Sequence, residues 1–254
     1  MVEVLQLVGR NIFKFVRQPA LIVVSLVMPI VMLGLFGQVF RSIAMTPNFP
    51  RGVSYIDYLL PAVLCTTLTQ SATSSSTAIA TDLSSGVMDR FRSLPIRAWT
   101  VLMARNIADL VRGVGQALVM LGLGLVVFGF RFRGSLFESV AAFLVAVPMA
   151  FAFNWLFIWI GVVVKNPEVT QVTGLLFTMP LMFASSAYVP VQSLPGWLQL
   201  VAKLNPLSFT IDAARAFALG KSPGSAAWQA IGVAVGLAVV CIVGASWSFR
   251  RIDG

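Results

Sequence analysis

The chain has 254 residues, of which 58% are hydrophobic and 11% are charged. A soluble domain carries about 25% charged residues, so this composition excludes a globular protein whose whole surface faces water. The net charge of +9 is carried mainly between the apolar runs, which indicates a membrane topology bias and not a nucleic-acid partner.

The first eighteen residues predict an amphipathic helix. Polar side chains recur at spacings of three and four from Glu3 to Arg17, with apolar side chains between them. Its cationic face favours a helix that lies in the membrane interface, and we assign residues 1–19 to it. A helix that docks on another protein surface is the alternative.

Six apolar runs follow, each long enough to cross a bilayer core of about 30 Å as a helix. Continuous runs predict helices and not the alternating strands of a barrel. We therefore expect an all-α polytopic membrane protein, with six transmembrane helices in a single domain of residues 1–254. The predicted spans are 20–40, 58–80, a run that follows Arg105 and ends near Phe130, 137–164, 169–189 and 227–249. A tight turn at 165–168 separates the fourth span from the fifth.

Basic residues set the predicted orientation. With the N-terminus inside, ten of the 18 Lys and Arg residues fall on the cytoplasmic side and seven fall outside, with Arg112 within the third span. The basic residues on the inner side cluster at the N-terminus, before the third span and at the C-terminus. This pattern predicts that both termini are cytoplasmic.

Two charged residues, Asp109 and Arg112, lie three apart on one face of the third predicted span. Charged residues within a membrane are costly and often functional. The alternative is a pair at the inner interface, where long side chains reach water. The sequence leaves both interpretations open.

The second predicted span is rich in hydroxyl side chains from Thr66 to Thr77, and it also carries Gln70. Small hydroxyl residues favour a helix–helix interface. Hydroxyls on every face of the helix favour, to the same degree, the lining of a polar or amphiphilic substrate path.

A charged segment, residues 81–105, connects the second and third spans. Leu83, Val87, Phe91 and Leu94 recur at spacings of three and four, which predicts a short amphipathic helix that Pro95 ends. Such a helix just inside the membrane suits a docking element for a partner. A solvated interfacial loop is the alternative.

This segment resembles the signature of type 2 ABC exporter permeases, particularly the daunorubicin-resistance group. The matching residues are Asp82, Gly86, Asp89, Arg90, Leu94 and Pro95. A second match lies after the fifth span, at Pro190, Leu194, Pro195, Gly196, Trp197, Leu198, Asn205, Pro206, Leu207, Asp212, Arg215 and Gly220. One departure is Asp82, where the family often has glutamate.

The resemblance implies a permease subunit, in a bacterial plasma membrane, that exports an amphiphilic or hydrophobic drug, antibiotic or lipid by alternating access. Two permease subunits, identical or related, would form the path among membrane lipids. Each would rest on a separate cytoplasmic ATP-binding subunit, which would hold ATP and Mg²⁺. The chain itself would then bind no cofactor or metal and would not be an enzyme.

The resemblance also implies roles for particular residues. Those that would couple to the ATPase are Asp82, Gly86, Asp89, Arg90, Arg92, Leu94 and Pro95. The path, lined by the second and fifth spans, would include Thr66, Thr69, Gln70, Thr73, Ser74, Thr77, Thr173 and Phe177. Residues 190–226 would form an outer re-entrant hairpin with a gate at Asn205, Pro206, Asp212 and Arg215.

Two other classes compete with this interpretation. A six-span secondary transporter or channel, not driven by ATP, would need a buried ion-coupling acid, for which Asp109 is the candidate. A membrane-embedded enzyme of lipid metabolism would need a nucleophile with its base, a carboxylate pair or a metal cluster. The chain has no histidine and nine scattered acidic residues, which disfavours the enzyme. The sequence leaves the substrate open, with a glycan as a further possibility.

Overall fold

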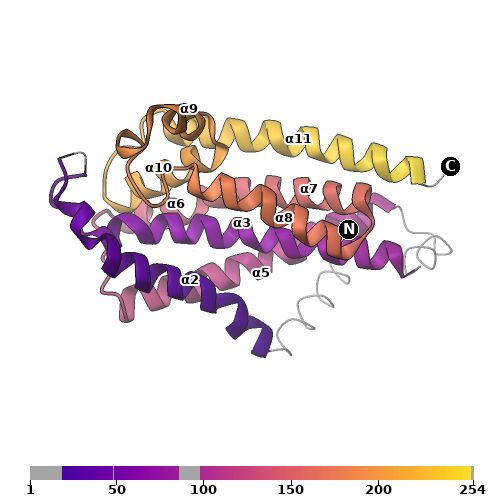
Figure 1. Cartoon of the computed structure of the whole chain (residues 1–254), viewed down its shortest axis with the longest axis horizontal. Helices are drawn as coiled ribbons and strands as arrows, with labels where there is room; N and C mark the ends of the chain where they lie inside the picture. The colour runs from indigo at the N-terminus through magenta and orange to yellow at the C-terminus, as the bar shows by residue number, and fades with distance from the viewer. Residues whose placement is uncertain (1–18, 48, 86–97, 253–254) are drawn as a thin grey trace.

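The computed structural model describes residues 19–47, 49–85 and 98–252. Every regular element in these ranges is a helix, which confirms the all-α prediction. The long helices run side by side along the longest axis of the molecule (Figure 1). The predicted interfacial helix lies outside the described residues up to position 18, as do residues 86–97 of the predicted coupling segment.

The chain forms nine α-helices and two short 3₁₀ helices within the described ranges. In chain order these are α2 (Pro19–Val39), η1 (Phe40–Met45), α3 (Tyr55–Ser84), α5 (Ala98–Val126), α6 (Leu136–Leu144), α7 (Ala146–Val164), α8 (Pro167–Phe183), η2 (Val191–Ser193), α9 (Gly196–Leu204), α10 (Pro206–Ala218) and α11 (Ala226–Ile252). Figure 1 places α9 and α10 at one end of the bundle, and the last turns of α11 at the other.

Three helical segments in the described ranges are long and apolar enough to cross a membrane. They are Thr100–Val126, Leu136–Val164 and Ala226–Phe249, and a shorter apolar segment is Leu26–Ser42. These segments support a polytopic membrane protein.

The turn between α7 and α8 forms where the sequence predicts it. Lys165 has a positive φ of 57° and ends α7. The Asn166 side chain accepts hydrogen bonds from the backbone N–H groups of Glu168 and Val169, and Pro167 occupies the first turn of α8. An asparagine followed by proline favours the start of a helix. The asparagine side chain accepts hydrogen bonds from unpaired N–H groups of the first turn, and the proline has no N–H that needs a partner.

The fourth predicted span is interrupted at Val145, which separates α6 from α7. Pro148 follows three residues later. A proline has no N–H to donate, and its ring crowds the carbonyl four residues before it, here that of Leu144. The span is therefore two helices in line, which the apolar composition alone did not indicate.

The predicted fifth span is too long, because α8 ends at Phe183 and not at residue 189. Beyond it the backbone carbonyls are bonded by side chains of distant elements instead of by helical N–H groups. Tyr58 and Arg215 donate to the Ser186 carbonyl, and Tyr55 donates to that of Tyr188. The start of the third helix also differs, since α5 begins at Ala98 and already contains Arg105.

Helix α3 lies at the centre of the bundle and packs against α2, α5, α7, α8 and α10. It comes close to α7 at Gly161, where a Cβ atom would lie 2.5 Å from the Ser76 carbonyl oxygen. Gly113 allows a similar approach between α5 and Ser71 of α3. Small residues at helix crossings let two backbones come close and pack tightly.

Candidate functional site

The predicted coupling residues are only partly described. Asp82 lies in the last turn of α3 and is half-buried. The others lie outside the described residues: Gly86, Asp89, Arg90, Arg92, Leu94 and Pro95. Their role in coupling therefore stays a prediction.

Most hydroxyl side chains of α3 donate a hydrogen bond to a carbonyl of the same helix, three or four residues earlier. They are Thr66, Thr67, Thr69, Ser71, Thr73, Ser74, Ser76, Thr77, Thr81 and Ser84. Such back-bonding satisfies a hydroxyl without a partner on another helix. Abundant hydroxyls in α3 therefore do not require a polar neighbour at every face.

A polar groove of about 640 Å³ opens beside α3. We use "polar groove" for the cavity lined by Val24, Met28, Pro29, Thr67, Gln70, Ser71, Ser74, Arg112, Gln116 and Gln171. Helices α2, α3, α5 and α8 contribute these residues. The groove brings together polar side chains that lie far apart in the sequence, inside an otherwise apolar bundle.

The predicted path residues of α3 divide between the groove and other surroundings. Gln70 and Ser74 line the groove. Thr66 and Thr69 are buried and are not among its lining residues. Thr73 packs against Gly174 of α8, and Thr77 is half-buried further along α3.

Arg112 forms the charged wall of the polar groove. Its Nη2 donates to the Ser71 carbonyl at 3.1 Å and to the Ser74 hydroxyl, and it lies 3.1 Å from Asp109 Oδ1. The Arg112 side chain is 19% exposed. It is thus anchored to both α3 and α5, with part of its surface facing the groove.

Asp109 is buried and holds three partners. Arg105 Nε donates to its Oδ2 at 2.9 Å, Arg112 pairs with its Oδ1, and the Ser75 hydroxyl donates at 2.5 Å. A buried carboxylate is tolerated when ion pairs and hydrogen bonds replace its hydration. The side chains of Arg105 and Arg112 are 22% and 19% exposed, so both ion pairs of Asp109 are mostly enclosed by protein.

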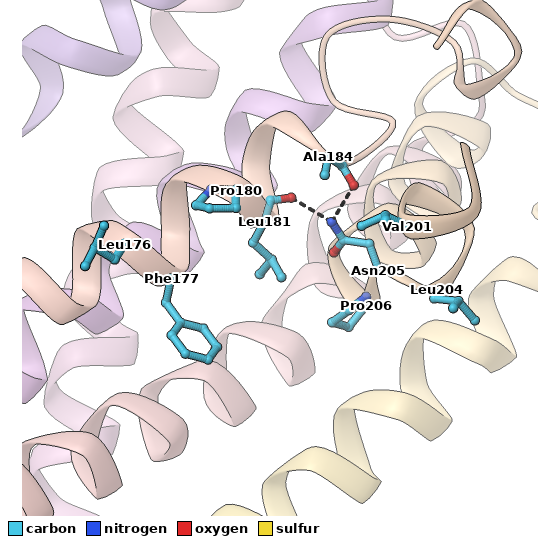
Figure 2. Close-up of a pocket in the computed structure, with 9 residues that line it drawn as sticks. All are labelled: Leu176, Phe177, Pro180, Leu181, Ala184, Val201, Leu204, Asn205 and Pro206. Carbon is cyan, nitrogen blue, oxygen red and sulfur yellow. Dashed lines mark hydrogen bonds between the residues drawn. The ribbon is translucent and has the colours of Figure 1, made fainter. Parts of the chain in front are cut away.

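A second, apolar pocket lies where α8 meets α9 and α10 (Figure 2). Its volume is about 480 Å³, and its lining is Leu176, Phe177, Pro180, Leu181, Ala184, Val201, Leu204, Asn205 and Pro206. Phe177, a predicted path residue, is 52% exposed at this pocket. Thr173, the other one on α8, donates its hydroxyl to the Val169 carbonyl and does not line the pocket.

Asn205 connects two helices, α8 and α10, at the edge of this pocket. Its Oδ1 accepts from the Leu207 N–H at 2.9 Å and caps α10, which Pro206 begins. Its Nδ2 donates to the carbonyls of Leu181 and Ala184 at 2.7 and 2.8 Å, as Figure 2 shows. One amide thus starts α10 and binds the last turn of α8 to it.

Arg215 of α10 is buried and bonds to the chain segment after α8. Its guanidinium donates to the carbonyls of Ser186, Ala187 and Tyr58, and its carbon lies 3.5 Å from the centre of the Tyr58 ring. Asp212, one turn earlier, pairs with it at 3.0 Å. The predicted gate residues therefore stabilise one junction between α3, α8 and α10.

Sequence reasoning missed several members of these sites. Gln116 and Gln171 line the polar groove, and amide side chains within apolar spans were the available signal. Tyr55 and Tyr58 hold the segment after α8. Their position at the start of α3 is visible in the sequence, but their partners more than 120 residues away are not.

Comparison with known proteins assigns the chain to a family. A family model described as ABC-2 type transporter matches residues 2–219. The daunorubicin resistance ABC transporter permease protein DrrB1 of Streptomyces coeruleorubidus is 30% identical over 206 residues, which cover 81% of this chain and 71% of that protein. The probable doxorubicin resistance ABC transporter permease protein DrrC of Mycobacterium tuberculosis is 29% identical over 252 residues, covering 96% and 86%. A putative transport permease, ycf38 of Pyropia yezoensis, is 26% identical over 222 residues, covering 84% and 72%. These matches confirm the resemblance noted in the sequence, and the chain belongs to the ABC-2 type transporter family.

Proposed function

We propose that this chain is the membrane-spanning permease subunit of an ATP-driven exporter that moves an amphiphilic or hydrophobic substrate outward by alternating access. The observation that carries the proposal is the polar groove within an apolar bundle, in a chain of the ABC-2 type transporter family. Two relatives are named as a daunorubicin resistance and a probable doxorubicin resistance permease protein, and these names support a drug-like substrate.

Six spans with both termini in the cytoplasm are part of the proposal. They would be α2, α3, α5, α6 with α7, α8, and α11. Back-bonded hydroxyls support α3 as a span, because they lower the cost of its polar composition in lipid. In this topology α9 and α10 face outward, and the end of the bundle that carries Ser84 and Ala98 faces the cytoplasm.

The substrate path in this proposal follows α3 and α8. The polar groove offers amides and hydroxyls, and the apolar pocket beside Phe177 lies on α8 nearer to α9 and α10. A path with one polar and one apolar surface suits an amphiphilic molecule. The junction of Asn205 and Arg215 would act as the outer gate, because it fixes how α8 meets α10.

Coupling would pass through residues 81–97 to a cytoplasmic ATP-binding subunit. The chain would supply no ATP site of its own, and a second permease subunit, identical or related, would complete the path. Asp82, the described member of this segment, lies at the end of α3, the same helix that lines the polar groove. A movement at the predicted coupling segment would thus reach the groove through one continuous helix.

Co-purification with a candidate ATP-binding subunit in mild detergent tests the proposal. We expect a stable complex with ATPase activity, and loss of the complex when Asp89 and Arg90 are both replaced by alanine. The matched control replaces Lys203 and Lys221 by alanine. Both side chains are exposed, in α9 and just after α10, at the end of the bundle away from Ser84 (Figure 1). Absence of any ATP-binding partner, with transport that instead collapses on addition of a protonophore, would favour the secondary transporter.

A further inference from the structure

The polar groove has an asymmetric chemistry. Val24, Met28 and Pro29 of α2 give it one apolar wall. Gln70 and Gln171 contribute amides from α3 and α8. Arg112 is the one charged side chain among the described residues that line it. One side therefore offers a surface for a hydrocarbon chain, while the other offers hydrogen bonds and positive charge.

Among the described residues, the ion-paired cluster around Arg112 carries a net positive charge. The cluster consists of Arg105, Asp109 and Arg112, which carry two positive charges and one negative charge. Helix α2 contributes no charged residue. Glu168, in the first turn of α8, is one turn from Gln171 and is exposed outside the groove lining. In surroundings of low dielectric, this excess favours an anion over a neutral or cationic group.

The shape of the Arg112 group also favours an anion with several oxygens. The guanidinium is a planar fork that can share one partner while it donates to another. Its Nη2 makes the contacts to Ser71, Ser74 and Asp109. Phosphate, sulfate and carboxylate oxygens are the acceptors that such a fork binds best.

We propose that the polar groove binds an amphiphile with an anionic headgroup, held at Arg112 with help from Gln171, and with its apolar chain against α2. The idea that this amphiphile is the exported substrate rests on the proposed function. The charge preference rests on the groove alone. A resident anionic phospholipid has the same chemistry as an exported anionic amphiphile, and the experiment separates the two.

The test uses the full chain in phosphatidylcholine vesicles with a photoactivatable phosphatidylglycerol. A photoactivatable phosphatidylcholine with the same acyl chains is the neutral comparison. We expect the anionic probe to crosslink to α2, α3 and α8 about tenfold more than the zwitterionic one, the size of one charge-assisted hydrogen bond. Equal crosslinking of both probes at these helices would overturn the proposal.

Two variants assign the preference to the groove. Arg112→Gln should remove the preference, Arg112→Lys should keep most of it, and Lys221→Gln, at an exposed site, should leave it unchanged. Gln171→Glu places a negative charge at the rim without touching the Arg112 contacts, and should also remove the preference. Gln229→Glu on the exposed face of α11 is its control. A preference that survives both Arg112→Gln and Gln171→Glu would place the anion elsewhere.

Competition and transport arms identify the source of the ligand. Inorganic phosphate should not compete with the probe, and competition by phosphate alone would contradict an amphiphile site. In vesicles with the ATP-binding subunit, ATP-dependent movement of labelled phosphatidylglycerol would mark it as cargo, and binding without movement would mark a resident lipid. Both results support the charge preference. Because crosslinking needs no ATP-binding subunit, its failure beside an intact complex overturns this inference alone.

Discussion

The guanidinium carbon of Arg215 lies 3.5 Å from the centre of the Tyr58 ring, across 157 positions of sequence. The same side chain donates to the carbonyls of Ser186 and Ala187, which follow the end of α8. One residue of α10 thus replaces the helical N–H groups that this segment lacks.

Replacing Arg215 by alanine should destabilise the folded protein strongly. The change removes hydrogen bonds to three buried carbonyls, those of Tyr58, Ser186 and Ala187, and it removes the ring contact. The Ser186 carbonyl keeps the bond from the Tyr58 hydroxyl. We expect a loss of about 3 kcal/mol. Arg215→Lys keeps the charge but not the planar guanidinium, so its stability should lie between those of the wild type and Arg215→Ala. Thermal unfolding in detergent measures this, with Arg131→Ala, at an exposed side chain, as the control. Equal melting temperatures for Arg215→Ala and Arg131→Ala would contradict the assignment.

Asn205→Ala should cost more than the loss of an ordinary helix cap. Asn205 caps α10 and also binds the carbonyls of Leu181 and Ala184. Asn166 caps α8 with bonds only to its own helix, so Asn166→Ala should cost about 1 kcal/mol. We expect about twice that cost or more for Asn205→Ala. Asn205→Asp should not restore stability, because a carboxylate can cap α10 but cannot donate to the two carbonyls. Unfolding of the three variants in parallel decides this.

Gly161→Ala should destabilise the contact between α7 and α3. The new Cβ would meet the Ser76 backbone at 2.5 Å, where no flexible side chain can move aside, and overpacking of this kind costs about 1–3 kcal/mol. Gly232→Ala on α11 is the control, because no atom lies within 4 Å of its Cβ position. Gly232→Ala should be neutral or slightly stabilising in thermal unfolding, as alanine favours a helix more than glycine does. A lower melting temperature for the control than for Gly161→Ala would show that this crossing is not tight.

Asp109→Asn should be more harmful than Asp212→Asn. Removing the buried carboxylate leaves Arg105 and Arg112 without their common counter-ion, which we expect to cost about 3 kcal/mol. Asp212 is 45% exposed, so its ion pair with Arg215 should contribute less than about 1 kcal/mol. A double variant, Asp109→Asn with Arg112→Gln, should recover part of the loss in a double-mutant cycle. Strict additivity of the two single losses would argue against their coupling.

The parts of the fold that depend on local chemistry could be predicted from the sequence. The turn at Asn166 and Pro167 was found because a capping residue and a proline act on their immediate neighbours. The sequence predicts the end of α8 too late, because the apolar run continues past Phe183. What ends this helix is a set of donors on α3 and α10, and no local pattern reveals contacts of that kind.

In the candidate site, too, the features that depend on local sequence were predictable and the contacts between distant segments were not. The hydroxyl-rich part of α3 was recognised, but the sequence could not say which hydroxyls face the groove. Gln70 and Ser74 do, whereas Thr66 and Thr69 are buried elsewhere. The two interpretations of Asp109 and Arg112 could not be separated because Ser75, on another helix, is needed to see that Asp109 is enclosed. The predictions for residues 86–97 stay predictions.

The back-bonded hydroxyls of α3 have a mechanical consequence. A side chain that donates to its own helix keeps that bond when the helix turns or slides against a neighbour. Most hydroxyls of α3 are of this kind, and Ser75, bonded to Asp109, is an exception. The helix can therefore exchange one set of contacts for another without breaking a ladder of interhelical hydrogen bonds. The hydroxyl-rich surface of α3 therefore lets the helix move against its neighbours, whereas the hydrogen bond between Ser75 and Asp109 anchors α3 to α5.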